Sequence, residues 1–302
     1  MNVIGIDIGG TTIKGALLNK EMDLIHTCQV STNAHEGKPA ILSALTQVLD
    51  SLIHQRNLPI SGIGIGSAGR INIETGIVQY ATDNLPGWHG FPLQTWVEEN
   101  YGIPTIVDND ANTALLGELY ISDQLHQQSV VMLTIGTGVG GANYFFGQIV
   151  RGAHHQSGEW GHMVLYPDGR LCNCGKSGCA EQYLSGTAIR NQAQKVTGLA
   201  FEHGKEVFQQ MNQNNQLGKV VENFLSDLAL LIENIFVSLD PDRIILGGGV
   251  VESKSVWWDR LIEILNDRNV KTIVSPATQM NRAGMFGAAY LALQTRKEVK
   301  NS

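Results

Sequence analysis

Short apolar segments alternate with longer amphipathic segments along the chain. The apolar segments have the length of buried strands, and several of them end in a run of glycines. In the longer segments apolar positions recur at helical spacing, as over residues 39–56. Strands are expected at residues 3–8, 13–18, 24–30, 60–67, 103–107, 130–135, 142–150, 243–246 and 271–274, and helices at residues 39–56, 111–120, 218–239, 257–266 and 284–297.

One arrangement occurs twice in this pattern. A strand, a glycine-rich turn and a second strand span residues 3–18, and the same order recurs over residues 130–150. Alternating strands and helices favour an α/β fold, and the repeated arrangement suggests two similar halves that face each other across a cleft. We expect a first domain of residues 1–115, joined by a C-terminal helix of about residues 286–302, and a second domain of residues 116–285.

Size, charge and cysteine distribution argue against several classes of protein. A chain of 302 residues with 43% hydrophobic residues can bury a large core. Its formal net charge of -7 argues against nucleic acid and anionic membranes as partners, and no segment has the ~18 apolar residues of a membrane helix. Three of the four cysteines lie between Cys172 and Cys179, which is not the spread of a disulfide framework. We therefore expect a cytoplasmic protein.

Two glycine-rich turns can bind an anion through backbone N–H groups. In the first turn, glycines and threonines at residues 9–12 follow Asp7 and let the backbone approach a phosphate closely. The second turn, residues 136–141, has the spacing G-x-G-x-x-G, but an apolar strand follows it where a dinucleotide-binding motif requires a helix. Each turn alone fits a plain hairpin equally well. Together with the glycines at residues 247–249 they favour a nucleotide, with Asp7 organising Mg²⁺.

The stretch Asp108-Asn109-Asp110 lies between an expected strand and an expected helix. Phosphoryl transfer to an alcohol needs a carboxylate that takes the hydroxyl proton while Mg²⁺ and backbone donors hold the phosphoryl group. Asp108 and Asp110 are both candidates for this carboxylate. Capping of the following helix is an equally good explanation for Asp110.

A histidine and three cysteines form a second candidate site. His162 supplies an imidazole, and Cys172, Cys174 and Cys179 supply thiolates, which together close a tetrahedral structural Zn²⁺ site. Cys172 and Cys174 are too close in sequence to pair well as a disulfide, and nearby glycines permit the sharp turn that lets all three sulfurs face one point. The sequence therefore favours zinc over a disulfide.

Five motifs resemble the ROK family of repressors and sugar kinases. In chain order they are DIGGTTIK, DNDANTALLGE, LTIGTGVGG, GEWGH and CNCGKSGCAEQ, and the resemblance covers nearly the whole chain. It implies an α/β fold of the actin/hexokinase-like (ribonuclease H-like) class, which is a duplicated two-domain ATPase fold with an interdomain cleft. It also implies a homodimer, ATP with Mg²⁺, a structural Zn²⁺ and a small-molecule sugar substrate.

The resemblance assigns roles to single residues. It makes Asp110 the catalytic base and Asn109 a sugar contact, with Asp108 as a flanking residue. It suggests that His162 binds zinc through one ring nitrogen and presents the other to the sugar. A family glucokinase has Pro where this chain has Ser67, which weakens the match in that loop. The other sugar contacts implied are Glu159, His162, Glu181 and, on weaker matches, Gly69 and Asn84. The nucleotide and Mg²⁺ are expected at Asp7, Gly9, Gly10, Thr11, Thr12, Lys14, Thr137, Gly138, Gly247, Gly248 and Gly249.

These features predict an ATP-dependent sugar kinase that phosphorylates a hexose or N-acetylhexosamine at its 6-hydroxyl, with glucose or N-acetylmannosamine favoured. The alternative is a sugar-sensing ROK regulator that lacks catalysis and a DNA-binding domain. Repressors of the family carry a helix-turn-helix domain ahead of the core, whereas here the first glycine turn begins within ten residues of Met1. An actin- or chaperone-like ATPase would not explain the GEWGH motif and the cysteines.

Overall fold

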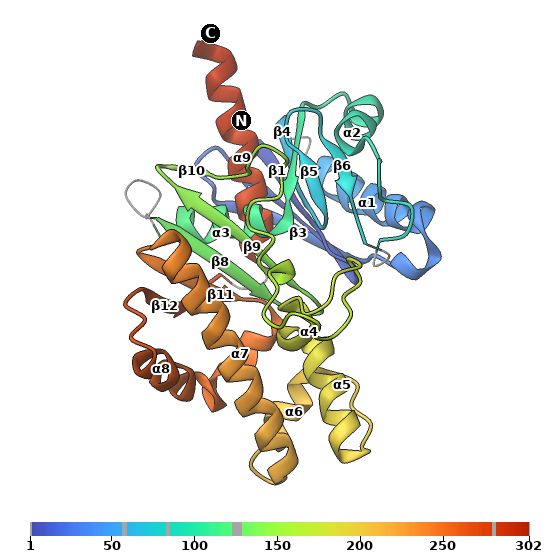
Figure 1. The fold of residues 1–302 in the computed structure, drawn as a ribbon. Coiled ribbons are helices and arrows are strands. Elements are labelled where there is room, and N and C mark those ends of the chain that lie inside the picture. Colours follow the sequence, from blue (N-terminus) through green and yellow to red (C-terminus); the bar gives the residue numbers. More distant parts are fainter. Residues whose placement is uncertain (1, 56–58, 83–84, 123–128, 280–281, 302) are drawn as a thin grey trace. The chain divides into compact units, whose positions relative to one another are not determined.

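A computed structural model gives the fold of the protein (Figure 1) and describes residues 2–55, 59–82, 85–122, 129–279 and 282–301. The chain forms two compact units, each built on its own five-stranded sheet. The first unit contains Met1–Leu125, Arg151–Ser157 and Asn281–Ser302, and the second contains His126–Val150 and Gly158–Met280. The expected domain boundary near residue 115 lies within a helix of the first unit and stays a prediction.

A mixed sheet is the centre of the first unit. Its strands are β1 (Asn2–Ile8), β2 (Thr12–Asn19), β3 (Leu24–Ser31), β4 (Ile60–Ser67) and β7 (Thr105–Asn109), in the order β3-β2-β1-β4-β7. The first three form an antiparallel meander, and β4 and β7 continue from β1 in parallel. A separate hairpin consists of β5 (Arg70–Asn72) and β6 (Ile77–Tyr80). The helices are η1 (Ala34–Glu36), α1 (Lys38–Ile53), α2 (Leu93–Tyr101), α3 (Asp110–Ile121) and α9 (Ala283–Asn301).

Isoleucine and glycine alternate along the central strands β1 and β4, so the two faces of this sheet differ. Successive side chains of a strand point to opposite faces, and the isoleucines therefore gather on one of them. Ile6 and Ile65 lie there in one buried cluster with Leu45 and Leu49 of α1. This face is an ordinary apolar core that the amphipathic helix α1 covers.

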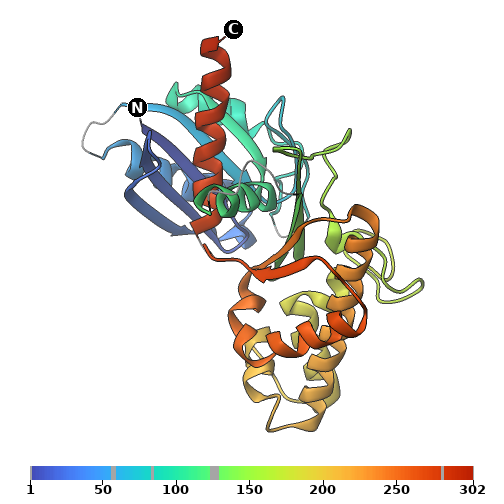
Figure 2. The ribbon, with the colours of Figure 1, turned by 90° about the vertical axis from the view of Figure 1, so that its left-hand side faces the viewer.

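The glycine face of the same sheet receives the C-terminal helix α9 (Figure 2). A Cβ on Gly5 would lie 1.9 Å from the carbonyl oxygen of Met285, and a Cβ on Gly64 would lie 1.7 Å from that of Ala288. Glycine at these positions lets the helix backbone lie directly on the strands. Further glycines on α3 and α9 let these two helices contact each other just as closely.

The second unit repeats the order of the first sheet, strand for strand. Its strands are β8 (Val130–Ile135), β9 (Val139–Phe145), β10 (Gln148–Ile149), β11 (Arg243–Gly247) and β12 (Ile273–Pro276), in the order β10-β9-β8-β11-β12. Antiparallel β8, β9 and β10 form the meander, and β11 and β12 continue in parallel. The helices are η2 (Trp160–His162), α4 (Glu181–Leu184), α5 (Gly186–Thr197), α6 (Gly204–Gln210), α7 (Asn215–Leu239), η3 (Gly249–Val256) and α8 (Trp258–Asp267).

Helix α7 supplies much of the core of the second unit. Its residues Leu228 and Leu231 are buried in one cluster with Leu133 of β8 and Ile244 of β11. Asp227 is also nearly buried, at 9% exposure, although Phe224, Leu228 and Leu231 on the same face of α7 are apolar. Within the described ranges, no helix is both long and apolar enough to cross a membrane.

Candidate active site

Three polar residues lie where β7 ends and α3 begins in the first unit. Asn109 is the N-cap residue of α3, because its side-chain oxygen accepts hydrogen bonds from the backbone N–H groups of Ala111 (2.9 Å) and Asn112 (3.2 Å). The alternative explanation that Asp110 is the N-cap is therefore wrong. Asp110 accepts a hydrogen bond from the N–H of Ala111 (2.9 Å), and part of its surface stays accessible.

Asp108 is fixed in a buried ion pair. Its Oδ2 accepts hydrogen bonds from Nη2 (2.6 Å) and Nε (3.0 Å) of Arg151, and its Oδ1 accepts one from Nδ2 of Asn112 (2.9 Å). Only 1% of the Asp108 side chain is exposed. Asp108 thus flanks the candidate base, as expected, but it also ties the junction to residues 151–157 of the same unit.

Asp7 and Asp110 bring two carboxylates close together at the ends of β1 and β7. Burial and the charge of Asp110 raise the pKa of Asp7 to about 7, against a lowering by Lys14, its partner on β2. Burial also raises the pKa of Asp110, and the charge of Asp108 adds to the rise. Paired carboxylates that resist ionisation fit a divalent cation, whose charge reverses that preference. Oxygen ligands of this kind suit Mg²⁺.

The first glycine turn is closed by its own backbone and tied to the chain after β3. Gly9 N–H donates to Thr12 O (3.1 Å), and Thr32 Oγ1 donates to Gly9 O (2.7 Å). Gly10 and Thr11, at the tip of the turn, are exposed. The structure thus places Gly9, Gly10, Thr11 and Thr12 in one fixed turn, on the same hairpin as Asp7 and Lys14.

The second glycine turn lies against Glu181, the first residue of α4. Gly136 N–H donates to Gly138 O (2.9 Å), and the Glu181 carboxylate accepts a hydrogen bond from the N–H of Val139 (2.9 Å). A Cβ on Gly138 would lie 2.4 Å from Glu181 Oε2, so any other residue at this position would displace this carboxylate. Gly138, which is expected to bind the nucleotide, therefore lies directly beside Glu181, which is expected to bind the sugar.

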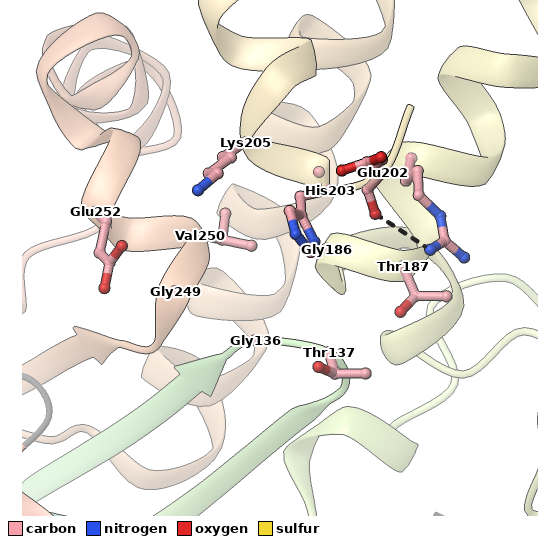
Figure 3. A pocket seen from close by; sticks show the side chains of 12 residues that line it. Gly136, Thr137, Gly186, Thr187, Glu202, His203, Lys205, Gly249, Val250 and Glu252 are labelled. Atoms are coloured by element: carbon pink, nitrogen blue, oxygen red, sulfur yellow. Dashed lines mark hydrogen bonds between the residues drawn. The ribbon is translucent and has the colours of Figure 1, made fainter. Parts of the chain in front are cut away.

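A pocket of about 430 Å³ opens beside this turn in the second unit (Figure 3). Figure 3 shows Thr137, His203 and Val250, from three different segments, around the same hollow. The residues that line it are Gly136, Thr137, Gly186, Thr187, Arg190, Glu202, His203, Gly204, Lys205, Gly249, Val250 and Glu252. The pocket thus offers backbone polar groups of glycines, two threonine hydroxyls, one apolar side chain and several charged groups, a combination that can bind a nucleoside.

The sequence identified only part of this pocket. Thr137 and Gly249 line it, whereas Gly138, Gly247 and Gly248 do not. Gly248 has a packing role instead, because it has φ 88° and a Cβ there would lie 2.5 Å from Ile135 O. The lining residues of α5 and α6 were missed. The one signal for them is a glycine at the first position of each helix, where a backbone can approach a ligand.

His162, Cys172, Cys174 and Cys179 form a cluster in the second unit, and their ligand atoms all lie within 4.8 Å of one another. Cys172 Sγ lies 3.7 Å from His162 Nδ1, and Cys174 Sγ lies 3.6 Å from Cys179 Sγ. Ligand atoms around a tetrahedral Zn²⁺ are separated by about 3.6–3.8 Å, so the donor set fits zinc. Burial raises the pKa of the Cys179 thiol to about 12, a rise that a bound cation would reverse. All four cysteines are free thiols.

The GEWGH motif places two expected sugar contacts at the ends of η2. His162 N–H donates to Glu159 O (3.0 Å), which closes this short helix. Between them, Trp160 donates its indole N–H to Asn143 Oδ1 on β9 (2.9 Å), which fixes the motif to the sheet. Because Nδ1 of His162 faces the thiols, Nε2 is the ring nitrogen left for another partner.

The two weaker sugar candidates have different outcomes. Gly69 has φ 105°, and its carbonyl oxygen accepts a hydrogen bond from Nδ2 of Asn109 (2.9 Å). A Cβ at this position would lie 2.4 Å from Tyr80 O, which explains the glycine. Asn84 lies outside the described residues.

Known proteins resemble this chain over nearly its full length. It is 32% identical over 320 residues to a glucokinase of Halalkalibacterium halodurans, covering 98% of this chain and 96% of the relative. It is 28% identical to a β-glucoside kinase of Listeria monocytogenes, covering 97% and 98%. Among solved structures, the ROK family glucokinase of Streptomyces griseus in complex with glucose and AMPPNP has 28% identity and a TM-score of 0.83, covering 97% of this chain and 100% of that chain.

The sequence profile of the ROK family matches residues 3–295. This match confirms the resemblance that the five motifs carry, and the solved relatives confirm the expected fold class. The chain belongs to the ROK family and has its two-domain α/β, actin/hexokinase-like fold.

Proposed function

We propose that this protein is an ATP-dependent sugar kinase in which Asp110 is the general base. The observation that carries the proposal is the place of Asp110, beside Asp7 at the start of a helix that Asn109 caps. Because burial raises the pKa of Asp110, the ionised carboxylate is a stronger base toward a sugar hydroxyl. The similarity to a glucokinase over 98% of the chain supports the reaction class.

Residues of the first unit hold the phosphates in this proposal. The turn of Gly9, Gly10, Thr11 and Thr12 offers backbone N–H groups and hydroxyls, and Lys14 adds a positive charge. Asp7 holds Mg²⁺ or its water ligands. When bound, Mg²⁺ neutralises charge on the phosphate oxygens. Asp110 takes the proton of the attacking hydroxyl as its oxygen approaches the phosphorus.

The nucleoside part of ATP occupies the pocket of the second unit. Thr137 and Gly249 line this pocket, and Gly138, Gly247 and Gly248 shape the loops beside it. The Streptomyces griseus relative was solved with the nucleotide AMPPNP, which supports ATP as the phosphoryl donor.

The sugar contacts in this proposal are Asn109, Glu159, His162 and Glu181, with Gly69 as a backbone contact. Carboxylates, an amide and an imidazole can each hold one or two hydroxyls of a hexose. We favour glucose or N-acetylmannosamine, phosphorylated at the 6-hydroxyl, and a homodimer as the assembly. The names of the relatives, glucokinase and β-glucoside kinase, support a hexose in general.

A structural Zn²⁺ bound by His162 and the three cysteines would orient the loop that carries the sugar contacts. We expect a chelator that removes the metal to weaken sugar binding before the protein unfolds, because His162 then loses the partner of its Nδ1. Calorimetric titration of the sugar, with circular dichroism as the control for folding, measures this. Unchanged sugar affinity in folded, zinc-free protein would contradict the role.

The proposal is tested by ATP consumption with Mg²⁺ over a panel of hexoses, N-acetylhexosamines and disaccharides. Wild type is compared with Asp110→Asn, which keeps the size of the side chain and removes its basicity. We expect one sugar to be turned over rapidly and the variant to lose ~100-fold or more in kcat. A sugar that binds and stabilises the fold without turnover would instead support a sugar-sensing regulator.

A further inference from the structure

The loop between His162 and Cys179, called here the zinc loop, is attached to the rest of the second unit largely through side chains. Most of its backbone hydrogen bonds pair the loop with itself, as between Leu165 N and Gly178 O (2.9 Å) and between Cys172 N and Lys176 O (2.8 Å). One more joins it to the start of α4, where Ala180 N–H donates to Met163 O (2.8 Å). A loop closed on itself keeps its internal shape, but its orientation depends on anchors outside it.

One such anchor joins the zinc loop to α7. The Tyr166 hydroxyl donates a hydrogen bond to Oδ1 of Asp227 (2.5 Å). This hydrogen bond raises the pKa of Tyr166 to about 12, so the phenol remains a donor at every physiological pH. Tyr166 is four residues beyond His162, and it is 41% exposed although its hydroxyl reaches a nearly buried carboxylate.

The buried carboxylate of Asp227 lowers the stability of the folded state. It is 9% exposed on the helix face that carries Phe224, Leu228 and Leu231, and burial raises its pKa. Among the described residues, its hydrogen-bond partner is Tyr166, and Arg170 is the cation near enough to act on it. A carboxylate with so few compensating groups in an apolar core costs folding free energy, so its hydrogen bond to the zinc loop points to a role other than stability.

The same group of side chains also reaches α4, which begins with the candidate sugar contact Glu181. Tyr183 of α4 lies with its ring centroid 4.9 Å from that of Tyr166. The guanidinium of Arg170 lies 4.5 Å from the Tyr183 ring centroid. The backbone N–H of Arg170 donates a hydrogen bond to the Tyr183 hydroxyl (2.9 Å). Tyr166, Arg170, Tyr183 and Asp227, called here the clamp, therefore connect the zinc loop, α4 and α7.

We propose that the hydrogen bond between Tyr166 and Asp227 is a positioning device for sugar recognition. It holds the zinc loop and α4 in the orientation that directs Glu159, His162 and Glu181 at the sugar. The inference rests on the proposed sugar kinase function. It adds two residues that touch neither zinc nor the sugar and act through the residues that do.

Three variants separate positioning from stability. Tyr166→Phe removes only the hydroxyl, and Asp227→Leu replaces the carboxylate with an apolar side chain that suits this core. Asp227→Asn keeps an acceptor for the tyrosine and serves as the conservative rescue. The matched control is Tyr101→Phe, because the Tyr101 hydroxyl makes a similar hydrogen bond to Asp50 (3.0 Å) within the other unit.

Steady-state kinetics with the sugar that wild type turns over, thermal unfolding and zinc content are measured for all variants. We expect Tyr166→Phe and Asp227→Leu to raise the KM for the sugar by about tenfold or more and to change the KM for ATP less than about twofold. Zinc content stays at the wild-type value, and Asp227→Leu unfolds no earlier than wild type. Asp227→Asn and Tyr101→Phe keep the KM of wild type.

Two results would overturn the positioning role while leaving the kinase proposal intact. One is an active wild type whose sugar KM is unchanged in Tyr166→Phe and Asp227→Leu. The other is a sugar KM that rises only together with the KM for ATP or with an equal rise in Tyr101→Phe. A wild type that turns over no sugar would instead refute the proposed function itself.

Discussion

Asp108 and Asp110 are two residues apart, yet a partly buried cation contacts the first carboxylate and not the second. Arg151 compensates the buried charge of Asp108 at 2.6 Å. The charge of Asp110 is desolvated, and Asp108 and Asp7 add repulsion of the same sign. Removing the Asp108 carboxylate would therefore leave the Arg151 charge without this partner, whereas the raised pKa of Asp110 means that its ionised form destabilises the folded state.

Replacing each aspartate with asparagine tests this difference. We expect Asp108→Asn to lower the free energy of unfolding by about 3 kcal/mol, because the Arg151 charge loses its buried partner. Asp110→Asn should raise the melting temperature above pH 7 in Mg²⁺-free buffer while abolishing turnover. Urea and thermal denaturation measure both. A loss of stability in both variants would show that the two carboxylates play the same role.

Asp7 should make stability depend on pH. Its folded-state pKa is about 7, against 3.8 for the free side chain, so the folded protein keeps a proton that the unfolded chain releases. Wild type should therefore lose stability relative to Asp7→Asn as pH rises from 4 to 7, by up to about 4 kcal/mol for a shift of about three units, and the difference should then level off. Urea unfolding of both proteins from pH 5 to 8.5 without Mg²⁺ checks this, and a difference independent of pH would contradict it.

From the sequence, candidate residues could be named, but the contacts that these residues make in the fold could not. The role that the motifs give to Asp110 stays a prediction, and the four expected metal ligands, His162 and the three cysteines, do form a cluster. The sequence could not decide whether Asn109 or Asp110 caps α3, since both residue types cap helices well. Nor could it find Arg190, His203 or Glu252 at the pocket, because distant segments bring them together and no local pattern marks them.

At the scale of elements, hydrophobic periodicity located most of the strands and the long helices within a few residues. The single strand expected at residues 142–150 is wrong, because a turn divides it into β9 (Val139–Phe145) and β10 (Gln148–Ile149). The helix expected at residues 257–266 is α8 (Trp258–Asp267), and the one expected at 284–297 is α9 (Ala283–Asn301). The hairpin of β5 and β6 and the helices α2, α5 and α6 were not predicted. The hairpin strands, α2 and α6 are short, and α5 has only two large apolar residues, Ile189 and Val196, so these segments carry too few apolar positions to show a period. The alternation of glycine and isoleucine indicated strands but not the helix that contacts the glycines.

Two glycines of β4 test the close packing of α9. A Cβ on Gly64 would lie 1.7 Å from Ala288 O, whereas a Cβ on Gly62 would lie no nearer than 3.6 Å to any atom outside its immediate chain neighbours. We expect Gly64→Ala to lower the free energy of unfolding by about 1–3 kcal/mol through overpacking, and Gly62→Ala to leave it nearly unchanged. Chemical denaturation measures both variants, and an equal loss for the two would contradict the direct contact.

At the scale of the whole molecule, the duplication that the sequence suggested is present in the topology. The meander of three strands followed by two parallel strands occurs in both units. Each unit also buries an apolar cluster of its own. The sequence could not show that residues 151–157 pack with the first unit, because the contacts that place them are far apart along the chain.

Removal of α9 should damage the unit at the opposite end of the chain. A chain that ends at residue 280 lacks the helix that covers Gly5 and Gly64. The glycine face of the first sheet therefore loses the helix that packs against β1 and β4. We expect limited proteolysis to degrade residues 1–125 of this variant while a fragment of the second unit resists. Equal protection of both units would show that α9 is dispensable for the first.

The return of α9 to the first sheet also sets an order for biosynthesis. The whole of the second unit lies within residues 126–280, and all of these residues leave the ribosome before α9 does. The nascent first sheet, although synthesised before the second unit, keeps its glycine face uncovered until α9 has been made. At 5–20 residues per second this delay is roughly 10–35 s. During this time the packing of the first unit depends on a segment that has not yet been synthesised.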